Sequence, residues 1–121
     1  MRLIERRMRR SDSRELALRY QIAHARDQAR LEALVLADGA GIVIAESGDR
    51  AVCEELAAIA PLLSVSLGMP MPPLLRGADV AVRSVRVHGQ PVYLASVGGT
   101  VARDALLSTS LRGVYRILSS N

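Results

Sequence analysis

The fold of this 121-residue chain is decided by residues 34–45, which read Leu-Val-Leu-Ala-Asp-Gly-Ala-Gly-Ile-Val-Ile-Ala. Two apolar runs, at 34–37 and 42–45, flank Asp38–Gly41, whose glycines can adopt the positive φ angles of a tight turn. Short apolar runs bounded by turn residues are typical of buried strands. The segment therefore predicts two antiparallel strands joined by a turn and closed by Ser-Gly-Asp at 47–49.

A long apolar helix is predicted directly after this hairpin, from about Arg50 to Leu67. One stripe of large residues recurs at helical spacing and is expected to face the core. It comprises Val52, Leu56, Ile59, Leu63 and Leu67. A strip of small residues lies beside it and would allow another backbone to approach closely. That strip comprises Cys53, Ala57, Ala60 and Ser64.

The remaining side of this helix carries two glutamates and then Ala58, Leu62 and Val65. Its C-terminal half is therefore apolar nearly all round, and such a helix is expected to be buried on every side. In a chain of this size, a second copy supplies that burial most easily. Pro61 removes one backbone donor and is expected to kink the helix.

Residues 1–10 form a basic leader, which we place outside a single domain at residues 11–121. The leader is either a solvated arm or a contact for nucleic acid or an anionic membrane surface. Asp12 and Glu15 have the spacing of a capping box, so a helix is expected to begin near Ser11 and to run to about Arg30.

That first helix carries two apolar stripes on nearly opposite sides, which predicts that it is covered on two sides. The stripes are Leu16, Tyr20 and Ala23 on one side and Leu18, Ile22, Ala25 and Ala29 on the other. Three arginines share a third side and are candidates for contacting a partner. They are Arg19, Arg26 and Arg30.

The C-terminal half predicts a loop, a hairpin and a last helix. Val80–Val87 alternates in polarity, residues 88–90 turn, and Val92–Val97 returns. Apolar residues then recur at helical spacing, so residues 101–119 are expected to be helical. A short fifth strand at Ala105–Leu107, followed by a shorter helix, is the alternative.

Composition limits the classes of function. Half of the residues are apolar, which is enough for the core of one domain, but there are only three tyrosines and no Phe or Trp. All 16 basic residues are arginines, which indicates codon usage in a GC-rich genome rather than a binding function. Residues 1–30 carry nine of them against four acidic residues, whereas the remainder is nearly neutral, which argues against nucleic-acid binding by the whole domain.

Nothing in the sequence predicts catalysis, a metal site or a cofactor. His24 and His88 lie far from each other and from Cys53, so no zinc spacing is present. Residues 98–100 lack the lysine of a phosphate-binding loop. The single cysteine excludes an internal disulfide and fits a reducing cytoplasm. No apolar run is long enough for a membrane span, and a signal peptide is not expected.

The order helix, strand, strand, helix, hairpin, helix resembles the Roadblock/dynein light chain family. Residues 34–45 look like the opening hairpin of that family, whose turn typically reads Asp-Gly before an apolar strand. Residues 54–60, Glu-Glu-Leu-Ala-Ala-Ile-Ala, look like its central helix. The chain departs from the family near the C-terminus, where a fifth strand usually precedes the last helix.

The resemblance implies an α+β fold, with an antiparallel sheet of four or five strands and helices on both faces. It also implies a homodimer, or a heterodimer with a paralogue, that pairs the central helices and continues the sheet across the two-fold axis. Together with the apolar sides of the central helix, this gives a predicted dimer interface. Its residues are Cys53, Ala57, Ala60, Leu62, Ser64, Val65 and Val85.

Members of the family typically bind small Ras-like GTPases as activators or scaffolds, which implies a non-enzymatic GTPase regulator. No arginine finger is identifiable, so any stimulation of hydrolysis would order the switch loops of the GTPase itself. Two other classes of function remain open. One is a small-ligand sensor of the profilin- or GAF-like type, and the other is a module whose arginine-rich leader binds nucleic acid or an anionic membrane.

Overall fold

The computed structural model of the chain describes residues 2–65, 70–100 and 102–120. Its three α-helices, one short 3-10 helix and four strands follow the order α1, β1, β2, α2, η1, β3, β4, α3. The helices are α1 (Arg2–Ala29), α2 (Arg50–Leu63), η1 (Pro73–Leu75) and α3 (Arg103–Ser119). The strands are β1 (Leu31–Asp38), β2 (Val43–Gly48), β3 (Val80–Val87) and β4 (Gln90–Gly98).

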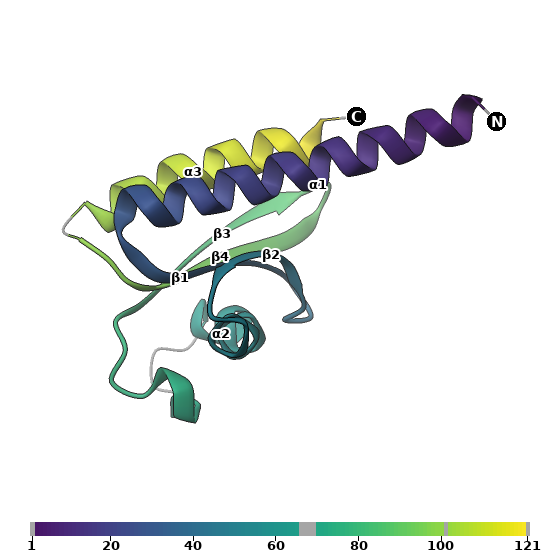
Figure 1. Cartoon of the computed structure of the whole chain (residues 1–121). Coiled ribbons are helices and arrows are strands. Elements are labelled where there is room, and N and C mark those ends of the chain that lie inside the picture. The colour runs from purple at the N-terminus through teal and green to yellow at the C-terminus, as the bar shows by residue number, and fades with distance from the viewer. Residues whose placement is uncertain (1, 66–69, 101, 121) are drawn as a thin grey trace.

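The four strands form one antiparallel sheet in the order β2-β1-β4-β3. Helices α1 and α3 lie side by side across one face of the sheet, and α2 lies alone on the other face (Figure 1). The predicted α+β architecture, with helices on both faces of an antiparallel sheet, is confirmed. Within the described residues the sheet has four strands, because Ala105–Leu107 belongs to α3.

Two apolar clusters fill the spaces between the sheet and its helices. On the α1/α3 face, Ile22 and Val114 pack over Leu36 and Leu94. On the α2 face, the side chains of α2 pack over the alternate residues of the same strands, including Val35 and Ala95. Because β1 is central and covered on both faces, every residue from 33 to 37 is buried, which explains the unbroken apolar run.

The first helix begins earlier than the sequence indicated. α1 is continuous from Arg2, so a helix start near Ser11 with a capping box at Asp12 and Glu15 is wrong. Residues 2–12 contain no Gly or Pro, and their Arg, Leu, Met and Glu residues favour a helix, so nothing interrupts it there. The N-terminal part of α1 extends past the sheet and past the end of α3 (Figure 1).

Only one of the two apolar stripes of α1 is covered. Leu18, Ile22, Ala25 and Ala29 are buried against the sheet, whereas Leu16 and Tyr20 are exposed on the opposite side. The second helix begins at the predicted Arg50, because the Asp49 side chain accepts a hydrogen bond from the Val52 N–H at 3.1 Å. α2 ends at Leu63, and the predicted end at Leu67 lies outside the described residues.

The predicted turn between β1 and β2 is confirmed, and its geometry brings it against α2. The Asp38 carboxylate accepts hydrogen bonds from the N–H groups of Ala40 and Ile42 at 2.9 and 3.0 Å. Gly41 adopts a φ of +78°, and a Cβ at this position would stand 3.0 Å from the Cα of Ala58. Glycine is therefore required here both by the backbone angle and by the closeness of α2.

Gly41→Ala is expected to destabilise the protein by about 2–3 kcal/mol, because a positive φ and a backbone collision both oppose the added methyl group. Gly89→Ala is the matched control: Gly89 has a φ of +79°, but a Cβ added there would meet no atom of another described segment within 4 Å. It should cost only about 1 kcal/mol. Urea denaturation measures both, and equal losses would contradict the close contact between Gly41 and α2.

Candidate functional site

The orientation of α2 decides which of its residues are available to a partner. Leu56 and the small residues Cys53, Ala57 and Ala60 are completely buried and point into the core beneath the helix. Small side chains let the helix axis approach the sheet closely, so the close contact expected with a second copy is made instead with the chain's own sheet. The structure therefore corrects the predicted dimer interface at Cys53, Ala57 and Ala60.

The opposite side of α2 is exposed and apolar in its C-terminal half. Leu62 keeps 49% of its surface exposed and Val65, just past the helix, keeps 82%. Ala58, one turn before Leu62, is also exposed. We call Ala58, Leu62 and Val65 the outer face of α2. Ser64 is exposed beside it, and its hydroxyl donates a hydrogen bond to the Pro61 carbonyl at 2.8 Å.

Two further exposed apolar side chains come from segments that are fixed against α2. Ile42 belongs to the β1–β2 turn, which touches the backbone of Ala58 through Gly41. Leu74 belongs to η1, and its N–H donates a hydrogen bond to the Glu55 carboxylate at 3.1 Å. The segments on both sides of α2 are therefore held against it, and each carries an exposed apolar side chain.

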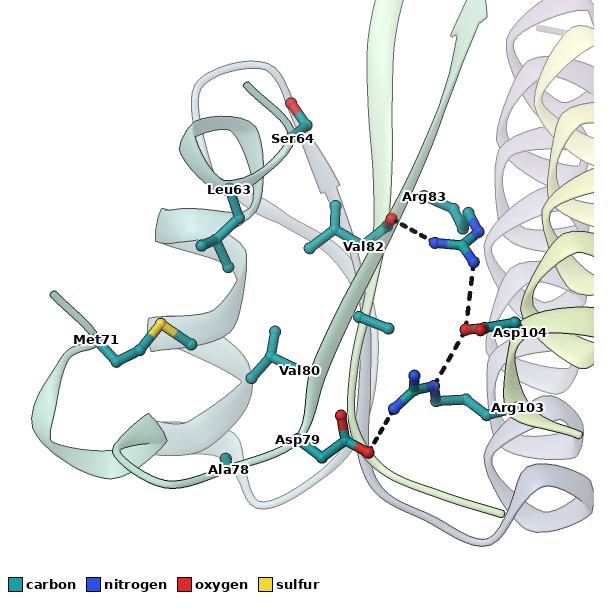
Figure 2. A pocket seen from close by; sticks show the side chains of 11 residues that line it. Leu63, Ser64, Met71, Ala78, Asp79, Val80, Val82, Arg83, Arg103 and Asp104 are labelled. Atoms are coloured by element: carbon teal, nitrogen blue, oxygen red, sulfur yellow. Dashed lines mark hydrogen bonds and ion pairs between the residues drawn. The ribbon is translucent and has the colours of Figure 1, made fainter. Parts of the chain in front are cut away.

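A row of successive ion pairs lies beside the edge strand β3 (Figure 2). Arg103 pairs with Asp79 at 2.7 Å and with Asp104 at 3.3 Å, and Asp104 pairs with Arg83 at 3.2 Å. The hydrogen bond to Asp79 raises the pKa of Arg103. These contacts tie the start of α3 to the edge of the sheet.

A hollow of about 650 Å³ wraps around this edge. Leu63, Met71, Val80 and Val82 line it on the α2 face, and Arg83, Arg103 and Asp104 line it on the α3 face (Figure 2). Sequence reasoning missed this cluster of ion pairs. In the sequence, the cluster is visible only as Asp79 before β3 and the pair Arg103-Asp104 at the start of α3. These residues are far apart in the sequence, and only the folded chain brings them together.

The three arginines predicted to contact a partner differ in their surroundings. Arg26 is partly buried and donates hydrogen bonds to the Leu31 carbonyl at 3.2 Å and to the Ser47 hydroxyl at 3.4 Å. Arg26 and Arg30 line a common hollow of about 400 Å³, whereas Arg19 pairs with Glu15 at 3.3 Å elsewhere on α1. Arg26 thus has a structural role, and Arg19 and Arg30 remain exposed.

The lone thiol is protected from solvent. Cys53 is buried, and burial raises its pKa above the ordinary value, so the thiol stays protonated at neutral pH. Its Sγ lies 3.7 Å from the Ser47 carbonyl oxygen. Among the described residues, no group of three or more His, Cys, Asp or Glu side chains is placed to hold a metal ion. In the same part of the chain, no helix has the length and apolar character needed to cross a membrane.

Comparisons with known proteins identify no family. No family model matches the chain, and no curated protein matches it. Among solved structures, Myxococcus xanthus MglB is similar, with a TM-score of 0.45 and 13% sequence identity over 87% of this chain and 86% of that one. At this level of similarity, the assignment of the fold rests on the strand order and layers of the chain itself.

The orientation of α2 is tested by adding the same charge at two adjacent positions. Ala57→Arg places a guanidinium in the core and is expected to destabilise the fold by more than about 3 kcal/mol. Ala58→Arg places the same charge on the outer face of α2, outside the core, and should retain the native circular dichroism spectrum, with a change of about 0.5 kcal/mol in the stability of the monomer. If Ala57→Arg were tolerated and Ala58→Arg were not, α2 would face the other way.

Proposed function

We propose that this chain is a non-enzymatic, homodimeric regulator or scaffold of a small Ras-like GTPase, acting in the cytoplasm. The observation that carries the dimer is the exposed apolar outer face of α2, with Leu62 and Val65 at its centre. Contiguous exposed apolar surface on a soluble domain marks an interaction site. A protein–protein contact is the function that such a surface supports best.

A second copy is the partner that suits this surface. A two-fold axis brings the same patch from both subunits together, so the patch must be complementary to itself. The outer face of α2 carries no charge, so two copies meet there without like-charge repulsion. Arg50 and the two glutamates of α2 lie nearer its N-terminal end, where they form a polar rim.

The GTPase partner rests on the resemblance of residues 34–45 and 54–60 to the Roadblock/dynein light chain family. The exposed Arg19 and Arg30 of α1 are the residues that we assign to this contact. In this proposal, regulation works by holding the switch loops of the GTPase in one conformation, since the chain offers no identifiable arginine finger. The proposed dimer surface lies on α2 and the proposed GTPase contact on α1, so each can be tested without the other.

Leu62→Glu is expected to convert the dimer into a folded monomer. The substitution buries a carboxylate in the interface, and the dissociation constant should rise by a factor of about 100 or more. Leu16→Glu is the matched control, because Leu16 is similarly exposed but lies on α1, across the sheet from α2. Light scattering coupled to size-exclusion chromatography gives the mass of each variant. A monomeric wild-type protein at micromolar concentration would refute the homodimer.

The GTPase contact is tested by affinity capture from the native lysate, once with a non-hydrolysable GTP analogue and once with GDP. A small GTPase should be retained at least five-fold better in one nucleotide state. The double variant Arg19→Glu/Arg30→Glu should lose this retention, while Arg76→Glu, a substitution at an exposed loop residue, should keep it. Failure to retain any GTPase would remove this part of the proposal and leave the dimer untouched.

A further inference from the structure

A hollow of about 400 Å³ lies at the C-terminal end of α1, where this helix packs beside the edge strand β2. Arg26 and Arg30, four residues apart, line the hollow, and Ser47 lines it from β2. Arg30 directly follows α1 and has a φ of +52°. The hollow therefore brings two arginines and a serine together at the β2 edge of the sheet, which is the opposite edge from β3.

Two hydrogen bonds orient the guanidinium of Arg26. Its Nε donates to the Leu31 carbonyl at 3.2 Å, and one terminal nitrogen donates to the Ser47 hydroxyl at 3.4 Å. A guanidinium carries five N–H groups, so three remain after these two bonds within the described residues. A guanidinium that is already oriented loses less conformational freedom when it binds an anion, so Arg26 is suited to receive one.

The charges of the hollow indicate which anion fits. Arg26 and Arg30 carry two positive charges, and Asp27, which also lines the hollow, carries one negative charge. Glu46 alternates with Ser47 on β2, so its side chain points to the other face of the sheet. One negative charge from a ligand balances the hollow, whereas a phosphate with nearly two charges would be repelled by Asp27. The hollow therefore favours a carboxylate, whose planar shape matches a guanidinium.

The surface around the hollow favours a protein as the source of this carboxylate. Ala23, Asp27 and Arg30 are exposed, so the hollow is open to solvent, whereas sites for small molecules enclose most of the ligand. Tyr20, one turn before Ala23, keeps 69% of its surface exposed, and Leu16, one turn further away, keeps 54%. An exposed apolar stripe of α1 therefore leads to the hollow, and tyrosine and arginine are both enriched in protein interfaces.

We propose that this hollow binds the side-chain carboxylate of an aspartate or glutamate on a partner protein. The carboxylate accepts hydrogen bonds from Arg26 and Arg30, and apolar residues of the partner cover Tyr20. Ser47 is a positioning residue, because its hydroxyl helps to orient the guanidinium of Arg26. Arg30 is also assigned to the GTPase contact, so only the identification of this partner as the GTPase rests on the proposed function.

The probe is a heptapeptide, leucine-glycine-glycine-glutamate-glycine-glycine-leucine, with both ends capped so that the glutamate carries its only charge. Tyr20 and Arg26 lie about 9 Å apart along the helix axis, a length that three extended residues span. Binding to the ¹⁵N-labelled full chain is followed by NMR through the Arg26 Nε–H and the backbone N–H groups of residues 26–31. We expect saturable shifts, with a dissociation constant on the order of 1–10 mM.

Three other probes identify the chemistry that is bound. The same heptapeptide with glutamine in place of glutamate should bind at least 10-fold more weakly, because it carries no charge. Methyl phosphate should bind more weakly than acetate, because Asp27 opposes the second negative charge. A heptapeptide with glycine in place of both leucines should bind about three-fold more weakly than the leucine peptide, and Tyr20→Ser should abolish that difference.

Substitutions in the hollow test the role of each residue. Arg30→Gln should weaken binding of the leucine peptide at least five-fold, whereas Asp27→Asn should strengthen it. Arg26→Lys keeps the charge but loses the planar group, and should also weaken binding at least five-fold. Ser47→Ala should weaken binding about three-fold, and Ser47→Thr, which keeps the hydroxyl, should restore it. Arg19→Gln is the matched control, since Arg19 pairs with Glu15 outside the hollow, and should bind as the wild type does.

Three results would overturn the inference. They are equal binding of the glutamate and glutamine peptides, undiminished binding by both Arg26→Lys and Arg30→Gln, and equal binding of the leucine and glycine peptides. The last result would mean that the hollow takes any free carboxylate and not one presented by a protein. None of these measurements uses a GTPase, so failure of the proposed GTPase contact and failure of this inference are distinguishable.

Discussion

The burial of β1 between two helical layers is the contact on which the rest of the structure depends. Leu34 and Leu36 pack under α1 and α3, and Val35 packs under α2, so one strand joins both cores. Neighbouring strands take their register from it, since β2 and β4 both pair with β1. Any change that exposes one face of β1 would loosen both helical layers together.

The close approach of α2 to this sheet has a second consequence. Leu56 and Ile59 point inward together with the small residues of α2, whereas Leu62 and Val65 on a third side are left on the outside. Burying large side chains is normally the favoured arrangement. Here the turn at Gly41 and the hydrogen bond from Leu74 to Glu55 hold α2 in place. The apolar side with Leu62 and Val65 is therefore exposed because the other sides of α2 pack against the sheet, and it is the side of α2 that another protein can reach.

The outer face of α2 and the edge of β3 differ in the contacts that they offer. The outer face of α2 is uncharged and suits a like surface, whereas the arginines beside the edge of β3 are paired with Asp79 and Asp104. The resemblance to the Roadblock/dynein light chain family also implies a sheet continued between two copies, and β3 is an edge strand of the described sheet.

The sequence by itself determined the element types of this protein, because they follow from local periodicity and turn chemistry. Alternation predicted the β3–β4 hairpin, Asp38–Gly41 predicted the first turn, and the apolar helical pattern after residues 47–49 predicted the start of α2 at Arg50. Only the tertiary structure decided that the small strip of α2 packs on the sheet beside the predicted large stripe and that the side of Ala58, Leu62 and Val65 stays outside, since all these sides are apolar and periodicity does not rank them. The tertiary structure also decided that Arg83 forms an ion pair with Asp104 and that Arg26 donates a hydrogen bond to the Leu31 carbonyl. Such partners are set by how the helices and strands pack against one another, which local sequence patterns do not show.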